Sequence, residues 1–462
     1  MPLISAGAAP IAQRQSSDQV PRSSFNFDST YEDSSLVDSR YNNFFFNRYN
    51  SLPMSANSIN SSNSDISRLQ QVYNMIITFC DDYLRVDKWS NEKRHLGFHI
   101  VLLIVATIVE RVTFKMTVDR MTPYRLVLLQ TILVFSMLIY GSITMLKQMT
   151  MNQEITPNME HFPTYKLVIM GLLDVTQFAG LVVCASGVSP TMTIILLHAS
   201  TPSMIIGSFF VFPDRVYNVT QIKGVKLIGL AVAVSVIRPI LDEFNTTIDY
   251  NIATSTLLYT VASTCLGLAT LYKEKCIIQW AQPLDIHYLS SWLFVYQLLW
   301  SLLLAPLIFF MQNVNSLGNT DDGDKNIGFP LSSFSENYGD GLRCLLGYNP
   351  DERTVNYDTS FTNCEGSILL CLLFVLSNII VLESINVVLQ MSNQVLARSM
   401  AVAVLFAFTA LGVYDTEVDY GLGYWGSNIG TADLVSIVFL VWGIEIYGNE
   451  AEPNVEVLTN YK

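Results

Sequence analysis

Hydrophobic residues are gathered into long runs from residue 97 onward, and short polar stretches separate these runs. An α-helix needs roughly twenty mostly apolar residues to cross the hydrocarbon core of a bilayer. By this measure the pattern predicts ten membrane-spanning helices, at 97–116, 124–146, 164–187, 190–213, 222–240, 251–271, 286–311, 367–389, 393–413 and 429–448. The predicted fold class is therefore an all-α integral membrane protein with ten transmembrane helices.

Two connections between these helices are very short. The third and fourth spans are joined only by "GVSP", and the eighth and ninth only by "QMSN". Each connection predicts a tight antiparallel hairpin. Ten spans divide into two sets of five, and an odd-numbered set inserts in opposite orientations, which is the inverted-repeat design of many transporters. We therefore expect two inverted five-helix repeats.

The two ends of the chain differ in composition from the hydrophobic region between them. Residues 1–65 are rich in Ser, Asn, Asp and Arg, which predicts a disordered tail. Residues 66–95 are predicted to form a juxtamembrane helix, and residues 96–449 to form the ten-helix transporter domain. Residues 450–462 are predicted to be a second tail. The beginning of the chain lacks the basic-then-apolar pattern of a signal peptide.

Composition supports a lipid environment and excludes several function classes. Half of the 462 residues are hydrophobic and 14% are charged, whereas soluble domains have about a quarter of their residues charged. The net charge of −13 argues against nucleic acid as a partner. No metal-ligand spacing, phosphate loop or nucleophile motif is present, so we expect no enzyme activity, no cofactor and no metal.

Charge asymmetry between the loops predicts the orientation in the membrane. The loops on the side of the two chain ends are basic, with Lys88, Lys93, Arg94, Arg215, Lys223, Lys226, Lys273 and Lys275. The opposite loops are acidic, except for the first, which contains Lys115, Arg120 and Arg125. Because basic loops remain on the cytosolic side, both termini are predicted to be cytosolic.

The long loop at 312–366 lies on the non-cytosolic side in this topology and contains Cys344 and Cys364. An oxidising compartment favours a disulfide between them, and two unrelated thiols are the alternative. A disulfide would fix a loop that is otherwise too long to be structureless.

Polar side chains inside the predicted spans are the candidate site. Ionisable groups in a membrane are costly, so they usually face a cavity or a partner. The candidates are Glu110 in the first span, Asp174 and Gln177 in the third, His198 in the fourth, Glu383 and Asn386 in the eighth, and Arg398 in the ninth. They predict a central cavity whose carboxylates attract a solute or take up a coupling proton. The alternative is that Glu110–Arg111 and Glu383–Arg398 are paired only for stability.

Residues 97–448 resemble the chloroquine-resistance-transporter-like proteins of the drug/metabolite transporter superfamily. The resemblance rests on "ERVTFKM" after the first span, "GLLDVTQFAGLVVCASGVSP" and "ILLHASTPSMI" in the third and fourth, "LYKEKCI" after the sixth, and the loop with cysteines before the eighth. It implies ten helices in two inverted repeats. It also implies that Asp174, Thr193 and His198 line the substrate cavity.

The sequence and the resemblance together predict a secondary active transporter that works by alternating access and is coupled to protons. Its solutes would be amino acids, small peptides or thiols, or cationic drugs, and its location an internal membrane such as a vacuole, lysosome or plastid. Its predicted partners are a small-molecule substrate, protons and the lipid bilayer. One alternative is a nucleotide-sugar or sugar-phosphate exchanger, which would need basic residues to hold phosphate. Another is a non-transporting membrane scaffold.

Overall fold

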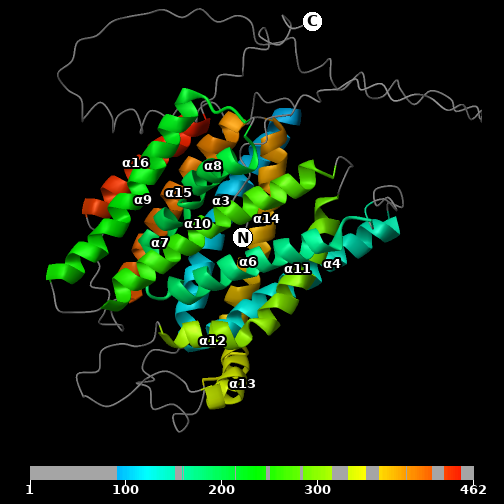
Figure 1. The fold of residues 1–462 in the computed structure, drawn as a ribbon, viewed down its shortest axis with the longest axis vertical. Coiled ribbons are helices and arrows are strands. Elements are labelled where there is room, and N and C mark those ends of the chain that lie inside the picture. The colour runs from blue at the N-terminus through cyan, green and yellow to red at the C-terminus, as the bar shows by residue number, and fades with distance from the viewer. Residues whose placement is uncertain are drawn as a thin grey trace, which may run out of the picture. The chain divides into compact units, whose positions relative to one another are not determined.

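The computed structural model describes residues 91–150, 159, 161–213, 215–245, 250–280, 285–314, 331–349, 364–391, 393–418 and 431–448. These residues fold into helices, drawn in Figure 1. Those of the first half are α3 (Asn91–Arg120), η2 (Thr122–Tyr124), α4 (Arg125–Thr150), α6 (Thr164–Ala185), α7 (Pro190–Leu197), α8 (Ser200–Val211) and α9 (Val219–Asn245). Those of the second half are α10 (Tyr250–Ile278), α11 (Ile286–Leu303), α12 (Ala305–Val314), η3 (Leu331–Ser333), α13 (Phe334–Leu345), α14 (Ser367–Met391), α15 (Asn393–Val418) and α16 (Thr431–Gly448). The predicted tails at 1–65 and 450–462, and nearly all of the predicted juxtamembrane helix, lie outside the described residues.

The prediction of an all-helical, multi-pass membrane protein is confirmed. In the described part of the chain, nine segments are long and apolar enough to cross a membrane, and α11 with α12 supplies a tenth if the bent pair is one span. That pair bends by 67° at Leu304. Pro306 lies in the first turn of α12, where its missing N–H costs nothing, so the chain begins a new helix there.

The fourth span is interrupted in its middle at His198 and Ala199, between α7 and α8. Pro202 cannot donate a hydrogen bond to the carbonyl of His198, four residues earlier, because it has no N–H. The backbone N–H of Thr201 donates to that carbonyl instead, at 3.1 Å. Ser189 accepts from Met192 N–H at the start of α7, and Pro190 follows it in the first turn.

Helices from the two halves pack against each other throughout the bundle. The main contacts are α9 with α16, α3 with α14, α6 with α10, α4 with α11, α8 with α10, and α3 with α15. In Figure 1, α9 and α16 lie together at one edge, and α4 and α11 at the other. The largest buried cluster combines residues of α3, α4, α6 and α14, among them Leu129, Val182 and Phe374.

The two ends of the bundle differ. We call the end where α3 begins and α16 ends the terminal end, and the end that holds α13 the disulfide end. The predicted Cys344–Cys364 disulfide is present there, and both residues are fully buried. The described part of the long loop contains α13, which packs on the start of α4. Tyr338 Oη donates to Gln130 Oε1 at 2.8 Å, and a Cβ at Gly341 would lie only 2.7 Å from Val127 Cγ2.

Loss of this disulfide is expected to destabilise the protein. The double variant Cys344→Ser/Cys364→Ser should lose about 3 kcal/mol of folding free energy, since the bridge closes a loop of 20 residues. Thermal unfolding of the purified protein in detergent, with and without a reductant, measures the change. The matched control is Cys265→Ser, which removes an exposed free thiol and should unfold with the wild type. Equal stability of reduced and oxidised wild type would contradict the prediction.

The basic residues of the first loop at the disulfide end are held by backbone carbonyls. Lys115 and Arg125 are buried at the end of α6: Lys115 Nζ donates to the carbonyls of Ala185 and Val188 at 2.8 and 2.9 Å, and Arg125 Nη1 donates to Val183 at 2.7 Å. Cations stabilise the C-terminal end of a helix, where carbonyls lack intrahelical partners. These contacts explain why the first loop at the disulfide end is basic, whereas the other loops predicted on that side are acidic.

Candidate functional site

A first cluster of buried polar groups joins α3 to α14. Glu110 is 1% exposed, and its Oε1 accepts a hydrogen bond from Asn378 Nδ2 at 2.9 Å. Its Oε2 lies 3.5 Å from Nη2 of the neighbouring Arg111. The pairing of Glu110 with Arg111, which the sequence offered as the alternative to a solute site, is thus present, and Asn378 adds a link to a helix of the other half.

A second cluster joins α6, α10 and α11. Asp174 is 4% exposed, and its Oδ2 lies 2.6 Å from Lys273 Nζ and accepts from Gln297 Nε2 at 2.7 Å. An ion pair this deeply buried loses most of its hydration, and the short contacts to Lys273 and Gln297 offset that loss. The three side chains come from three different helices, so the cluster fixes their relative positions.

Several buried polar atoms near these clusters have no hydrogen-bond partner among the described residues. They are both amide atoms of Gln177, which is 1% exposed, Oδ1 of Asp174 and Oε2 of Glu110. Most buried polar groups in proteins are hydrogen-bonded. Gln177 lies one helical turn after Asp174, so one face of α6 carries a donor and acceptors that have no hydrogen-bond partner among the described residues.

His198 and Thr193 belong to the interrupted fourth span. His198 is 9% exposed and lies at the break between α7 and α8. Thr193 is buried in α7 and donates its hydroxyl to the carbonyl of Pro190 at 2.6 Å, which leaves its oxygen able only to accept. Gly267 of α10 lies against this break, since a Cβ there would meet Ser200 and Ser203.

A third cluster lies at the terminal end and contains Glu383. His287 Nε2 lies 2.9 Å from Glu383 Oε1, and His287 Nδ1 lies 3.0 Å from Lys147 Nζ. Lys147 also pairs with Asp285 Oδ2 at 2.8 Å. Burial raises the pKa of Asp285, but hydrogen bonds from Lys147 and from the backbone N–H of Tyr288 outweigh it and hold the pKa below its usual value.

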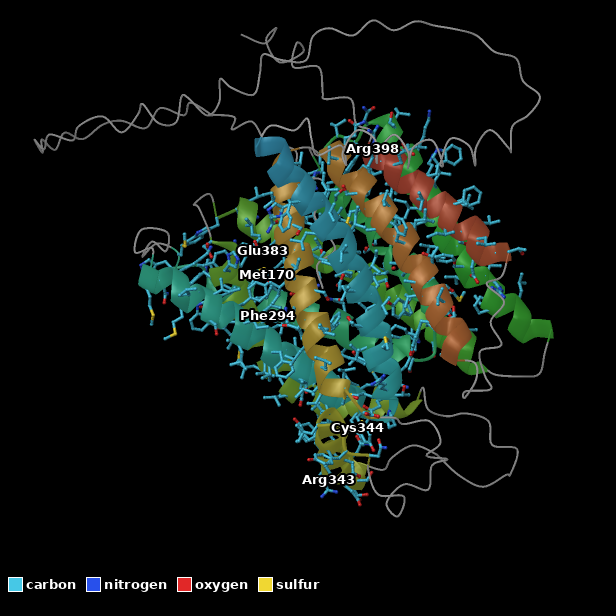
Figure 2. All side chains as sticks on the ribbon, turned by 180° about the vertical axis from the view of Figure 1, so that it is seen from behind. Met170, Phe294, Arg343, Cys344, Glu383 and Arg398 are labelled. Atoms are coloured by element: carbon cyan, nitrogen blue, oxygen red, sulfur yellow. A yellow bond between two sulfur atoms is a disulfide. The ribbon has the colours of Figure 1, made fainter. Side chains whose placement is uncertain are left out.

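The eight predicted site residues are therefore distributed rather than gathered around one point. Glu110, Asp174, Gln177, Thr193 and His198 are buried within the spans, whereas Glu383 lies nearer the terminal end. Figure 2 shows Arg398 near that same end, at the start of α15, and Cys344 at the opposite end. Asn386 is half-buried one turn after Glu383 on α14.

Three important partners were not predicted from the sequence. Gln297 and His287 are isolated polar residues in apolar runs, and Lys273 was assigned to a loop. That assignment of Lys273 is wrong, because α10 continues to Ile278 and turns its side chain toward Asp174. One indication of its place inside a span was present in the sequence. Lys273 lies three residues after Thr270, just as Glu110 of the first span lies three residues after Thr107.

Comparison with known proteins identifies relatives. A family model described as CRT-like, chloroquine-resistance transporter-like, matches residues 96–447. "Crt homolog 1" of Dictyostelium discoideum is 27% identical over 220 residues, which are 47% of this chain and 45% of the relative. The "Chloroquine resistance transporter" of Toxoplasma gondii is 23% identical over 297 residues, 62% of this chain and 31% of the relative.

The matched regions thus span less than half the length of these curated relatives. The family model, in contrast, covers about three quarters of this chain and all the spans described above. The family resemblance of the sequence is confirmed, and the chain belongs to the CRT-like, chloroquine-resistance transporter-like family.

Proposed function

We propose that the protein is a secondary active transporter, not an enzyme, that moves small zwitterionic solutes across an organelle membrane by alternating access, coupled to protons. The observation that carries the proposal is the pair of buried charge clusters inside the spans, Glu110–Arg111–Asn378 and Asp174–Lys273–Gln297. Buried charges are costly in a membrane and mark solute or ion pathways by default. Atoms of Asp174, Glu110 and Gln177 that lack hydrogen-bond partners in the described part are available to a solute.

The balance of charge supports a zwitterionic solute. Glu110 and Asp174 supply two carboxylates, while Arg111 and Lys273 supply two cations. A free amino acid or small peptide carries one group of each sign and can pair with both. A solely cationic drug would compete with Arg111 and Lys273 for these carboxylates and would offer neither cation an anionic partner. Because Lys273 and Arg111 can also hold phosphate, a nucleotide sugar remains the second candidate to be tested.

The packing of the helices supports the inverted-repeat part of the proposal. If each span is replaced by the span five places away in the chain, the α3–α14 contact becomes the α10–α6 contact. In the same way the α3–α15 contact becomes the α10–α8 contact, and all four contacts are present. The contacts α4–α11 and α9–α16 map onto themselves. The same exchange relates Glu110 to Lys273, each of which binds a polar side chain on the partner span. Two halves that can rock against each other around such a site provide alternating access.

The cellular setting is part of the same proposal. We propose that both termini are cytosolic, which the basic loops support, and the disulfide fits an oxidising opposite side. A vacuolar, lysosomal or plastid membrane would supply the proton gradient.

Uptake into proteoliposomes with an imposed pH gradient tests the proposal. The panel contains radiolabelled neutral and basic amino acids, glutathione and a nucleotide sugar, with the Glu110→Gln variant run alongside. We expect gradient-dependent accumulation of an amino acid or peptide, and a loss of at least about tenfold in Glu110→Gln, as removal of one charged hydrogen bond of roughly 1.5–3 kcal/mol implies. Exchange of the nucleotide sugar alone would favour the second candidate. Absence of any transport by folded protein would contradict both.

A further inference from the structure

The charge cluster at the terminal end links three helices from both halves of the bundle. We call Lys147, Asp285, His287 and Glu383 the His287 network. Lys147 lies near the end of α4, Asp285 caps the start of α11 and His287 lies in its first turn, and Glu383 lies on α14. The side chains of His287 and Asp285 are each 13% exposed, whereas Glu383 is 41% exposed and reachable from solvent.

The contacts of the network fit one tautomer of neutral His287. An ammonium group can only donate, so in the 3.0 Å contact with Lys147 Nζ the Nδ1 atom of His287 serves as the acceptor. With the ring proton on Nε2, that nitrogen donates to Glu383 Oε1 at 2.9 Å. This tautomer therefore satisfies both contacts.

A proton added at Nδ1 would change the contacts in a defined way. Nδ1–H could no longer accept from Lys147, and two cations would face each other at this distance. Asp285 Oδ1 lies 3.7 Å from Nδ1, so the imidazolium would compete with Lys147 for the Asp285 carboxylate. The contact with Glu383 would in turn become charge-assisted and stronger. Protonation thus weakens the link from α4 to α11 and strengthens the link from α11 to α14.

We propose that His287 binds a proton from the terminal side and thereby couples the pH on that side to separation of α4 from α11. Among the described residues, the titratable groups that contact its ring are Lys147 and Tyr140 of α4, Asp285 at the start of α11 and Glu383 of α14. The charge of histidine changes between about pH 5 and pH 8, the range found in cells. Since α4 and α11 belong to opposite halves, this inference rests on the proposed alternating access and names the residue at which a proton acts on it.

A distance measurement tests the proposal without any substrate. Nitroxide labels are placed at Met149 on α4 and Trp292 on α11, both exposed, in the full chain with Cys344 and Cys364 as the remaining cysteines. Double electron–electron resonance is recorded between about pH 8 and about pH 5.5, where histidine gains its proton. We expect the ratio of the longer-distance population to the shorter-distance population to rise roughly tenfold. This change follows if the arrangement in which α4 and α11 are separated binds the proton tenfold more tightly than the arrangement in which they are packed together.

The informative variant is His287→Gln. A glutamine amide can accept from Lys147 and donate to Glu383, but it cannot gain a proton, so its distance distribution should stay at the short distance at every pH. Lys147→Met removes the repelled cation and should also abolish the pH response. The matched control is His161→Gln, which changes an exposed histidine before α6 and should respond as the wild type does.

Each outcome decides the question. A pH response in His287→Gln equal to that of the wild type, or no response in the wild type, would overturn the proposal. Transport in proteoliposomes with a pH-insensitive distance would leave the proposed function intact and refute the role of His287. A His287-dependent distance change in a protein that moves no solute would refute the transport proposal instead.

Discussion

The Asp174→Asn variant is expected to lose about 3–5 kcal/mol of folding stability, because it leaves Lys273, whose side chain is only 16% exposed, without its counter-charge inside the bundle. The amide would keep the shape of the carboxylate but could not balance the ammonium group at 2.6 Å. Thermal unfolding followed by tryptophan fluorescence in one detergent measures the loss. The same variant should fail to accumulate solute, since a proposed binding group is removed.

A second substitution separates the structural and functional parts of this expectation. In Asp174→Asn/Lys273→Gln neither charge is buried, so most of the lost stability should return, whereas transport should not. The control is Arg343→Gln, which breaks a surface ion pair with Asp340 in which Arg343 is 68% exposed. Surface pairs contribute about 0–1 kcal/mol, so this variant should unfold almost as the wild type does. A double variant no more stable than Asp174→Asn would show that Lys273 is not the group left uncompensated.

Enlarging Gly224 is the second substitution from which we expect a large effect. A Cβ at Gly224 would lie 2.6 Å from the backbone nitrogen of Tyr447 and 2.8 Å from the carbonyl oxygen of Gly443. These atoms belong to the backbone of α16 and cannot turn aside as a flexible side chain could. Gly224→Leu should therefore force α9 from α16 and cost about 3 kcal/mol, the upper part of the range for overpacking. Small residues of this kind allow close helix approach in membranes.

The control for this prediction lies on the same helix. Gly229 has no atom within 4 Å of the position of an added Cβ. Gly229→Leu should be neutral or slightly stabilising, because glycine within a helix is unfavourable by roughly 0.5–1 kcal/mol. The melting temperatures of both variants are compared with that of the wild type. Equal melting temperatures for Gly224→Leu and Gly229→Leu would mean that the α9–α16 contact is not needed for stability.

Hydropathy alone was sufficient to place the spans, because a membrane requires about twenty apolar residues from each helix and few other arrangements satisfy this. The disulfide was also predictable, as two cysteines share one loop. A proline inside an apolar run, such as Pro202, indicates a kink in the fourth span, but only the backbone shows that α7 ends at Leu197. The bend before Pro306, where α11 ends at Leu303, was not predicted.

The candidate site was predicted by residue type but not by partner. Asp174 was identified because a carboxylate inside an apolar span is conspicuous, and its partner Lys273 was missed because a run of charges resembles the end of a span. Here that run is divided: Lys273 turns to Asp174, while Glu274 pairs with Arg215 at 2.5 Å. The alternative to a solute site paired Glu383 with Arg398, whereas Glu383 contacts His287, which lies 96 residues earlier in the chain. Such contacts depend on tertiary packing, which no local pattern contains.

The cations bound at the end of α6 have a consequence for how the chain is made. During synthesis α3 and α4 emerge before α6, so the carbonyls of Val183, Ala185 and Val188 do not yet exist as partners for Lys115 and Arg125. In the proposed orientation, with both termini in the cytosol, the loop that carries these cations must cross the membrane, against the rule that favours basic loops on the cytosolic side. Before α6 is made, Lys115 has Asp119 of its own helix as a partner, and the carbonyl contacts form only later. In that orientation we expect the first helical hairpin to become stable only once α6 has been translated, so that the order of translation becomes part of the folding mechanism.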